Sequence, residues 1–158
     1  MQFTNTNSLV GFALQMSETS FVKTQRFGEY TQSAWPKISQ LDRKVLANEI
    51  LLIIYSLPKK EQAALVAFHT QDIRAIKEVA TLILPRSWDF SLRIELARSW
   101  ACGQKIERSQ KEIAKDYMTS PAKIRIKMRD AFSLISENFN QSLNTLEPLL
   151  SELINTPL

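Results

Sequence analysis

Apolar residues recur every three or four positions along most of the chain after residue 38, the spacing of one buried face of an α-helix. The pattern starts at Ser39 and predicts a helix that ends near Leu57 and Pro58. Three more helices are predicted over residues 59–68, 73–84 and 88–102, with a turn at 69–72 and a stop at Pro85. Ser87 is the expected N-cap of the helix over 88–102, and Gly103 stands where a glycine usually ends one.

Residues 1–38 have the weakest pattern, with one short helical stretch from Leu9 to Met16. Glycine is scarce, three in 158 residues, although tight hairpins and phosphate-binding loops both need it. These features predict an all-α protein, one compact bundle of about six or seven helices. We expect a poorly patterned segment over 1–38 and a helical scaffold over 39–103.

The segment 104–136 is predicted to form a helix-turn-helix. Ser109 and Glu112 have the spacing of a capping box, which starts a two-turn helix. A turn at Met118 and Thr119 follows, and then Ser120 is an N-cap with proline at the first helical position. Ala114 is small at the point where the two helices would cross, so it should be buried there.

The second helix of this motif, over about Ser120 to Ser133, has two different faces. Ile124, Met128, Ala131 and Ile135 form an apolar stripe, and the opposite face is basic, as a helix in the major groove requires. We expect Lys123, Arg125, Ile126 and Arg129 to face a DNA groove, with Ser120 and Lys127 beside them. The basic residues that would neutralise flanking phosphates are Lys105, Arg108, Lys111 and Lys115.

Charge is distributed unevenly near the C-terminus. Residues 104–131 hold eight basic and four acidic side chains, and residues 132–158 hold three acidic and none basic. A local basic patch favours a polyanionic partner such as double-stranded DNA. Residues 137–158 are predicted to form an acidic amphipathic helix, broken or kinked at Pro148. This helix either folds back on the domain or contacts a partner, a second copy of the chain or a polymerase.

Two stretches of the chain resemble a known group of proteins. Gln-Lys-Glu-Ile-Ala at 110–114 and Ser-Pro-Ala-Lys-Ile-Arg at 120–125 resemble the helix-turn-helix of sigma-factor region 4. Ser-Leu-Pro-Lys-Lys-Glu-Gln-Ala-Ala-Leu at 56–65 resembles the helix found upstream in that group and in phage antitermination proteins of the Q type. This resemblance implies a phage-derived, DNA-binding transcription regulator, an antitermination factor in its sharper form, with bacterial RNA polymerase as a second partner.

Three positions depart from that family's pattern. Met118 replaces the turn glycine, Thr119 replaces an aliphatic residue, and Lys127 replaces an apolar one. A methionine reaches positive φ only at a cost in free energy, so the turn could differ from the family's.

Histidine and cysteine, two residue types common in catalytic and metal sites, occur once each. The chain has one histidine, His69, and one cysteine, Cys102, so no disulfide, zinc cluster or histidine pair can form within it. We expect no enzyme, cofactor or metal, a capping or surface role for His69, and a buried Cys102. No signal peptide or membrane span is predicted, so a cytoplasmic protein is expected. The alternative function is a helical protein–protein interaction module, an inhibitor or adaptor that uses the helix-turn-helix shape without DNA.

Overall fold

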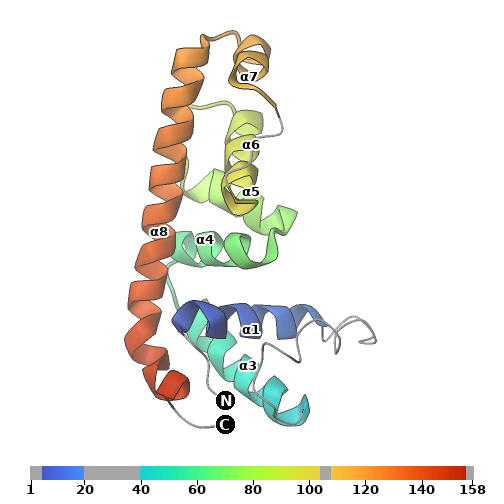
Figure 1. The fold of residues 1–158 in the computed structure, drawn as a ribbon, viewed down its shortest axis with the longest axis vertical. Coiled ribbons are helices and arrows are strands. Elements are labelled where there is room, and N and C mark those ends of the chain that lie inside the picture. Colours follow the sequence, from blue (N-terminus) through green and yellow to red (C-terminus); the bar gives the residue numbers. More distant parts are fainter. Residues whose placement is uncertain (1–4, 20–39, 104–107, 156–158) are drawn as a thin grey trace. The chain divides into compact units, whose positions relative to one another are not determined.

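The computed structural model describes residues 5–19, 40–103 and 108–155, and within these ranges it contains seven α-helices and no strand (Figure 1). The all-α prediction is therefore confirmed. The helices are α1 (Thr6–Thr19), α3 (Gln40–Tyr55), α4 (Lys59–Thr70), α5 (Ile73–Leu82), α6 (Phe90–Ala101), α7 (Gln110–Asp116) and α8 (Pro121–Asn155).

The chain divides into two compact units. The first unit comprises Met1–Leu57 together with Ser142–Leu158, and the second comprises Pro58–Gln141. In the first unit α1 packs on α3, and the end of α8 contributes Leu146 and Leu150, which are fully buried. This division falls at residues 57 and 141 rather than at the predicted 103 and 136, and its second point lies inside α8, which belongs to both units.

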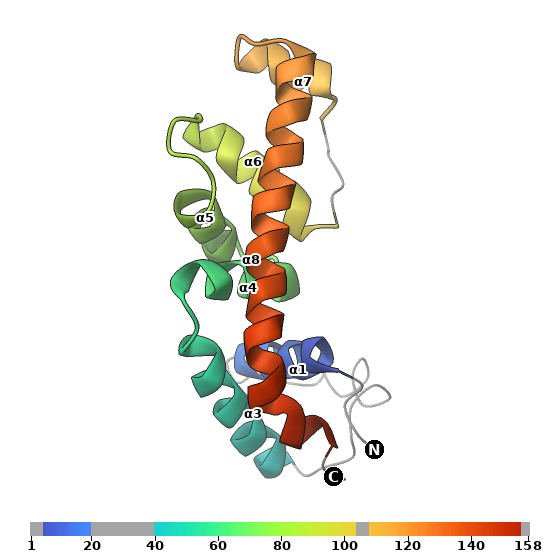
Figure 2. The ribbon, with the colours of Figure 1, turned by 90° about the vertical axis from the view of Figure 1, so that its left-hand side faces the viewer.

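The second unit has a single apolar core to which five helices contribute. Buried residues come from α4, α5, α6, α7 and the first half of α8, including Ala64, Ile76, Leu96, Ile113 and Ile124. Within this unit, α4 to α7 lie on one side of α8, and Figures 1 and 2 agree on this arrangement. The opposite side of α8, over residues 121–141, is therefore not covered by these helices.

Helix ends follow local signals, with one correction. Gly103 has φ +86, as the predicted C-terminal glycine should. Ser87, however, does not cap α6. The N–H of Trp88 donates to the carbonyl of Pro85 at 3.2 Å in a turn, and Asp89 is the N-cap. Its carboxylate accepts from the N–H of Ser91 at 2.9 Å. The turn that begins at Pro85 therefore contains Ser87 and Trp88, the residues that were expected to begin the helix.

The largest difference from prediction is α8, which is one helix of 35 residues. Residues 120–133 and 137–158 were expected to be separate segments, the second broken or kinked at Pro148. Instead α8 contains both, and Pro148 lies inside it without ending it; the kink there stays a prediction. Residues 122–147 hold no glycine or proline. An interior proline costs about 3 kcal/mol, and burial of Leu146 and Leu150 on either side of it offsets that cost.

Candidate nucleic-acid interface

The turn between α7 and α8 is closed by the hydrogen bonds that commonly end a helix. The N–H of Thr119 donates to the carbonyl of Ala114 at 2.9 Å, and the N–H of Met118 donates to that of Lys115 at 3.3 Å. This pair is a Schellman motif, which needs one residue in the left-handed region, and Met118 takes that place with φ 50. Met118 thus adopts the backbone conformation that glycine usually takes at this place.

Both helices of the pair are capped as the sequence predicts. The Oγ of Ser109 accepts from the N–H of Glu112 at 3.2 Å, and the Oγ of Ser120 accepts from the N–H of Lys123 at 3.3 Å. Ala114 is only 2 % exposed and shares the core cluster with Ile124. The short side chain that the motif requires between two crossing helices is therefore buried.

The first half of α8 separates apolar from charged residues as predicted. Ile124, Met128, Ala131 and Ile135 are buried, whereas Lys123, Arg125 and Arg129 are exposed. Ile126 lies among these cations and is 49 % exposed. We call Lys123, Arg125, Ile126 and Arg129 the basic face of α8. Arg125 and Arg129 are four residues apart, so they are neighbours on one side of the helix.

The residues predicted to flank this face differ in their surroundings. Lys127 is half-buried, and its ammonium lies 5.7 Å from the centre of the Trp88 ring, a cation–π contact with the loop before α6. Lys111 and Lys115 are exposed on α7, and Ser120 is exposed at its cap. Lys105 lies outside the described residues.

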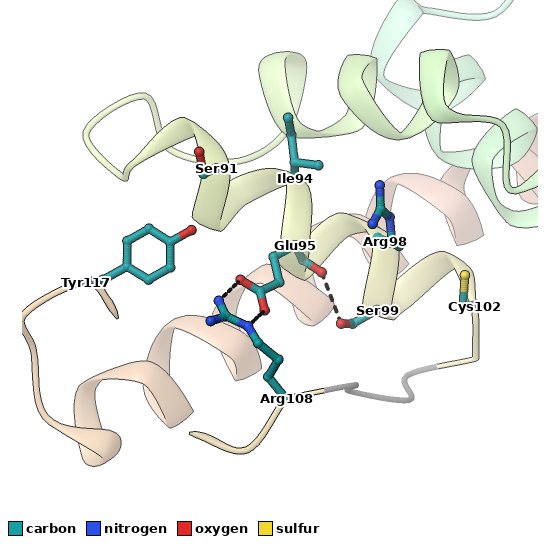
Figure 3. Close-up of a pocket in the computed structure, with 8 residues that line it drawn as sticks. All are labelled: Ser91, Ile94, Glu95, Arg98, Ser99, Cys102, Arg108 and Tyr117. Atoms are coloured by element: carbon teal, nitrogen blue, oxygen red, sulfur yellow. Dashed lines mark hydrogen bonds and ion pairs between the residues drawn. The ribbon is translucent and has the colours of Figure 1, made fainter. Parts of the chain in front are cut away.

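Arg108 has an intramolecular role that its position in the sequence does not suggest. Its guanidinium makes two hydrogen bonds to the carboxylate of Glu95 on α6, at 2.7 and 2.8 Å (Figure 3). It also contacts the carboxylate of Asp116. These bonds raise the pKa of Arg108, and the hydrogen bond to Glu95 makes the largest contribution. While they hold, two carboxylates occupy the planar donor face of Arg108. Its predicted contact with a phosphate would require these bonds to break, and it stays a prediction.

The same ion-pair network borders a cavity of about 350 Å³ next to α6 (Figure 3). Tyr117 lines it, and burial, together with the nearby carboxylate of Glu95, raises the pKa of its hydroxyl. Cys102 also lines it and is exposed, not buried as expected. The remaining lining residues are Ser91, Ile94, Glu95, Arg98, Ser99 and Arg108. In the cavity lining, the guanidinium of Arg108 is paired with the carboxylate of Glu95. The lining holds no histidine and no unpaired carboxylate that could act as a general base.

Among the described residues, no cluster of His, Cys, Asp and Glu could hold a metal ion. Among the helices of the same residues, none is both long and apolar enough to cross a membrane. Comparison of the chain with protein-family models, curated proteins and solved structures gives no match.

Proposed function

We propose that this protein is a DNA-binding transcription regulator and that α7 and α8 form its helix-turn-helix. The observation that carries the proposal is the basic face of α8. This helix buries one side against α4 to α7 and presents Lys123, Arg125 and Arg129 on the other. A capped helix anchored on one side and cationic on the other is the element that enters the major groove in this class of proteins.

The electrostatics around the basic face support the same reading. Residues 108–133 hold seven basic and three acidic side chains. Of the three carboxylates, that of Asp116 is bound by Arg108, and that of Asp130 lies 3.8 Å from Arg129. Lys111 and Lys115 extend the positive charge onto α7, where they can neutralise phosphates beside the groove and release counterions.

The direct test is a mobility-shift titration of the full-length protein with genomic restriction fragments at several salt concentrations. We expect the logarithm of the binding constant to fall linearly with the logarithm of the salt concentration, with a slope of about −0.9 for each phosphate neutralised. Selection from a random duplex pool should then return a defined sequence. If no fragment binds at low salt, the DNA-binding proposal is wrong.

Ala114→Leu tests the crossing of α7 and α8. Ala114 is buried, so three added carbon atoms must push the two helices apart, and we expect a loss of about 1–3 kcal/mol in the free energy of unfolding. DNA affinity should fall as well, because the basic face would move relative to α7. Denaturant titration measures the first effect and a mobility shift the second. Lys115→Leu, at an exposed neighbouring site, is the control for adding an apolar side chain in the denaturant titration alone, because it also removes a cation from the proposed DNA-binding surface. Equal stability of the two variants would contradict the crossing.

We further propose that the regulator is phage-derived, acts in the bacterial cytoplasm and contacts RNA polymerase, as an antitermination factor does. The resemblance to sigma-factor region 4 and to Q-type antiterminators supports this, and so does α3. Val45, Leu52 and Tyr55 are 51, 73 and 54 % exposed. They lie seven and three residues apart, on one side of the helix. A row of large exposed apolar side chains is typical of a protein-binding surface.

Leu52→Asp tests this use of α3. Leu52 is the most exposed of the three, so the fold and the affinity for DNA should be unchanged. Retention of core or holo RNA polymerase on the immobilised full-length protein should be lost. Asn48→Asp, which adds the same charge at an exposed position of α3, is the control.

The same row of residues also favours the alternative function, a helical interaction module that binds another protein without DNA. The two functions differ in one measurement. A protein that fails to bind any duplex but loses a protein partner on Leu52→Asp is an interaction module. A protein that binds duplex DNA and retains no polymerase subunit is a plain repressor or activator.

A further inference from the structure

Two large apolar side chains are exposed at the place where DNA would bind. Met118, in the turn before α8, is 96 % exposed, and Ile126, on the basic face, is 49 % exposed. Exposed apolar residues are common in folded proteins, so exposure alone assigns no role. The surroundings of these two residues supply the further observations.

Met118 combines a backbone conformation that costs free energy with a side chain that recovers none of that cost. Its φ of 50 places a residue with a β-carbon in the left-handed region, where glycine would be relaxed. Its side chain is also almost fully solvated, so it gains nothing from the core. A strained, exposed position next to a proposed site is the kind of position that binding, rather than folding, explains.

Ile126 is surrounded by groups that attract a polyanion. Lys123 and Arg129 are three residues from it along the helix, and Arg125 is adjacent. These cations would bring α8 into contact with a duplex, and Ile126 would then lie against base edges. In the major groove the one apolar group on a base edge is the C5 methyl of thymine. Isoleucine and methionine can both bury that methyl; isoleucine has no hydrogen-bonding group, and the methionine sulfur is only a weak acceptor.

We propose that Met118 and Ile126 each contact a thymine methyl group, so that the DNA sequence selected by this face contains an A·T pair at both positions. The inference rests on the proposed DNA binding by α7 and α8 and adds the kind of base that they select. Arg125 and Arg129 supply attraction and polar contacts, while the two apolar side chains discriminate against bases that lack the methyl.

The test compares two 30-base-pair probes that differ only in that methyl group: alternating dA-dT and alternating dA-dU duplexes. Full-length protein should bind the dA-dT duplex more tightly, by about fourfold for each methyl buried, the ratio that corresponds to one methylene removed from water. Ile126→Ala should lose about fourfold of that preference, and Met118→Gly another fourfold. Any preference for dA-dT that remains in the variant with both substitutions is due to duplex shape alone.

Two further measurements separate contact from folding. Met118→Gly should raise Tm, because glycine relieves the strain at φ 50, while it lowers the preference for dA-dT; a lower Tm would remove the argument for Met118. Ile73→Ala truncates another exposed isoleucine of the second unit, on α5, and should leave the preference unchanged.

The outcomes distinguish this inference from the function on which it rests. If wild-type protein binds both duplexes equally, or if both single variants keep the wild-type preference, DNA binding stands and the methyl contacts are overturned. If neither these duplexes nor any genomic fragment binds, the proposed function fails and the inference fails with it.

Discussion

The double variant Arg125→Ala/Arg129→Ala is expected to bind duplex DNA about 2–6 kcal/mol more weakly than the wild-type protein, at about 1–3 kcal/mol for each good base contact. Both side chains are exposed on α8, and that of Arg129 is 76 % exposed, so neither contributes to the core. Alanine also has the highest helix propensity. Helicity and Tm should therefore stay close to the wild-type values while affinity falls.

The measurement is a titration of labelled duplex at several salt concentrations, with circular dichroism on the same samples. Lys59→Ala/Lys60→Ala is the matched control, because it removes two exposed cations from α4 of the same unit. If net charge alone drove binding, the two double variants would lose equal affinity. A wild-type affinity for Arg125→Ala/Arg129→Ala would rule out the basic face of α8 as the DNA-binding surface.

Acidification from pH 7 to pH 4 is expected to destabilise the second unit through His69, by up to about 3 kcal/mol. His69 lies in the last turn of α4, half-buried beside the ring of Phe68, and burial lowers its pKa from 6.5 to about 4. Between these two pH values the unfolded chain binds a proton that the folded protein does not. The contribution of His69 to the free energy of unfolding is therefore fully present above about pH 6.5 and is lost as the pH falls towards 4. Below pH 4 this group changes the free energy of unfolding no further.

Urea titrations at half-unit pH steps, followed by tryptophan fluorescence, measure this effect, since Trp88 and Trp100 both lie in the second unit. Carboxylates titrate near the lower end of the same range. The informative quantity is therefore the difference in the free energy of unfolding between wild type and His69→Gln. That difference should vary with pH only between about 4 and 6.5. A difference that stays constant over this range would show that His69 is protonated equally in the folded and unfolded states.

Features set by neighbours in the chain could be read from the sequence. The caps at Ser109 and Ser120, the glycine at 103 and the buried stripe that begins at Ile124 each depend on residues one to four positions apart. Helix hydrogen bonds and helix faces have that same range. For this reason the all-α class and the two faces of α8 were predictable, and so was the burial of Ala114.

Features that depend on distant residues were decided by the tertiary structure alone. Arg108 was assigned to phosphate because its own segment is basic, but Glu95, 13 residues earlier on α6, binds it instead. The pKa of His69 depends on burial, which no local pattern shows. The continuity of α8 through Pro148 depends on apolar residues that are buried on both sides of the proline. The sequence by itself thus determined the caps at Ser109 and Ser120 and the buried sides of their helices, because those signals are local. Only the folded chain decided which charges pair, where α6 begins and where the units divide, since these features depend on contacts that no local pattern shows.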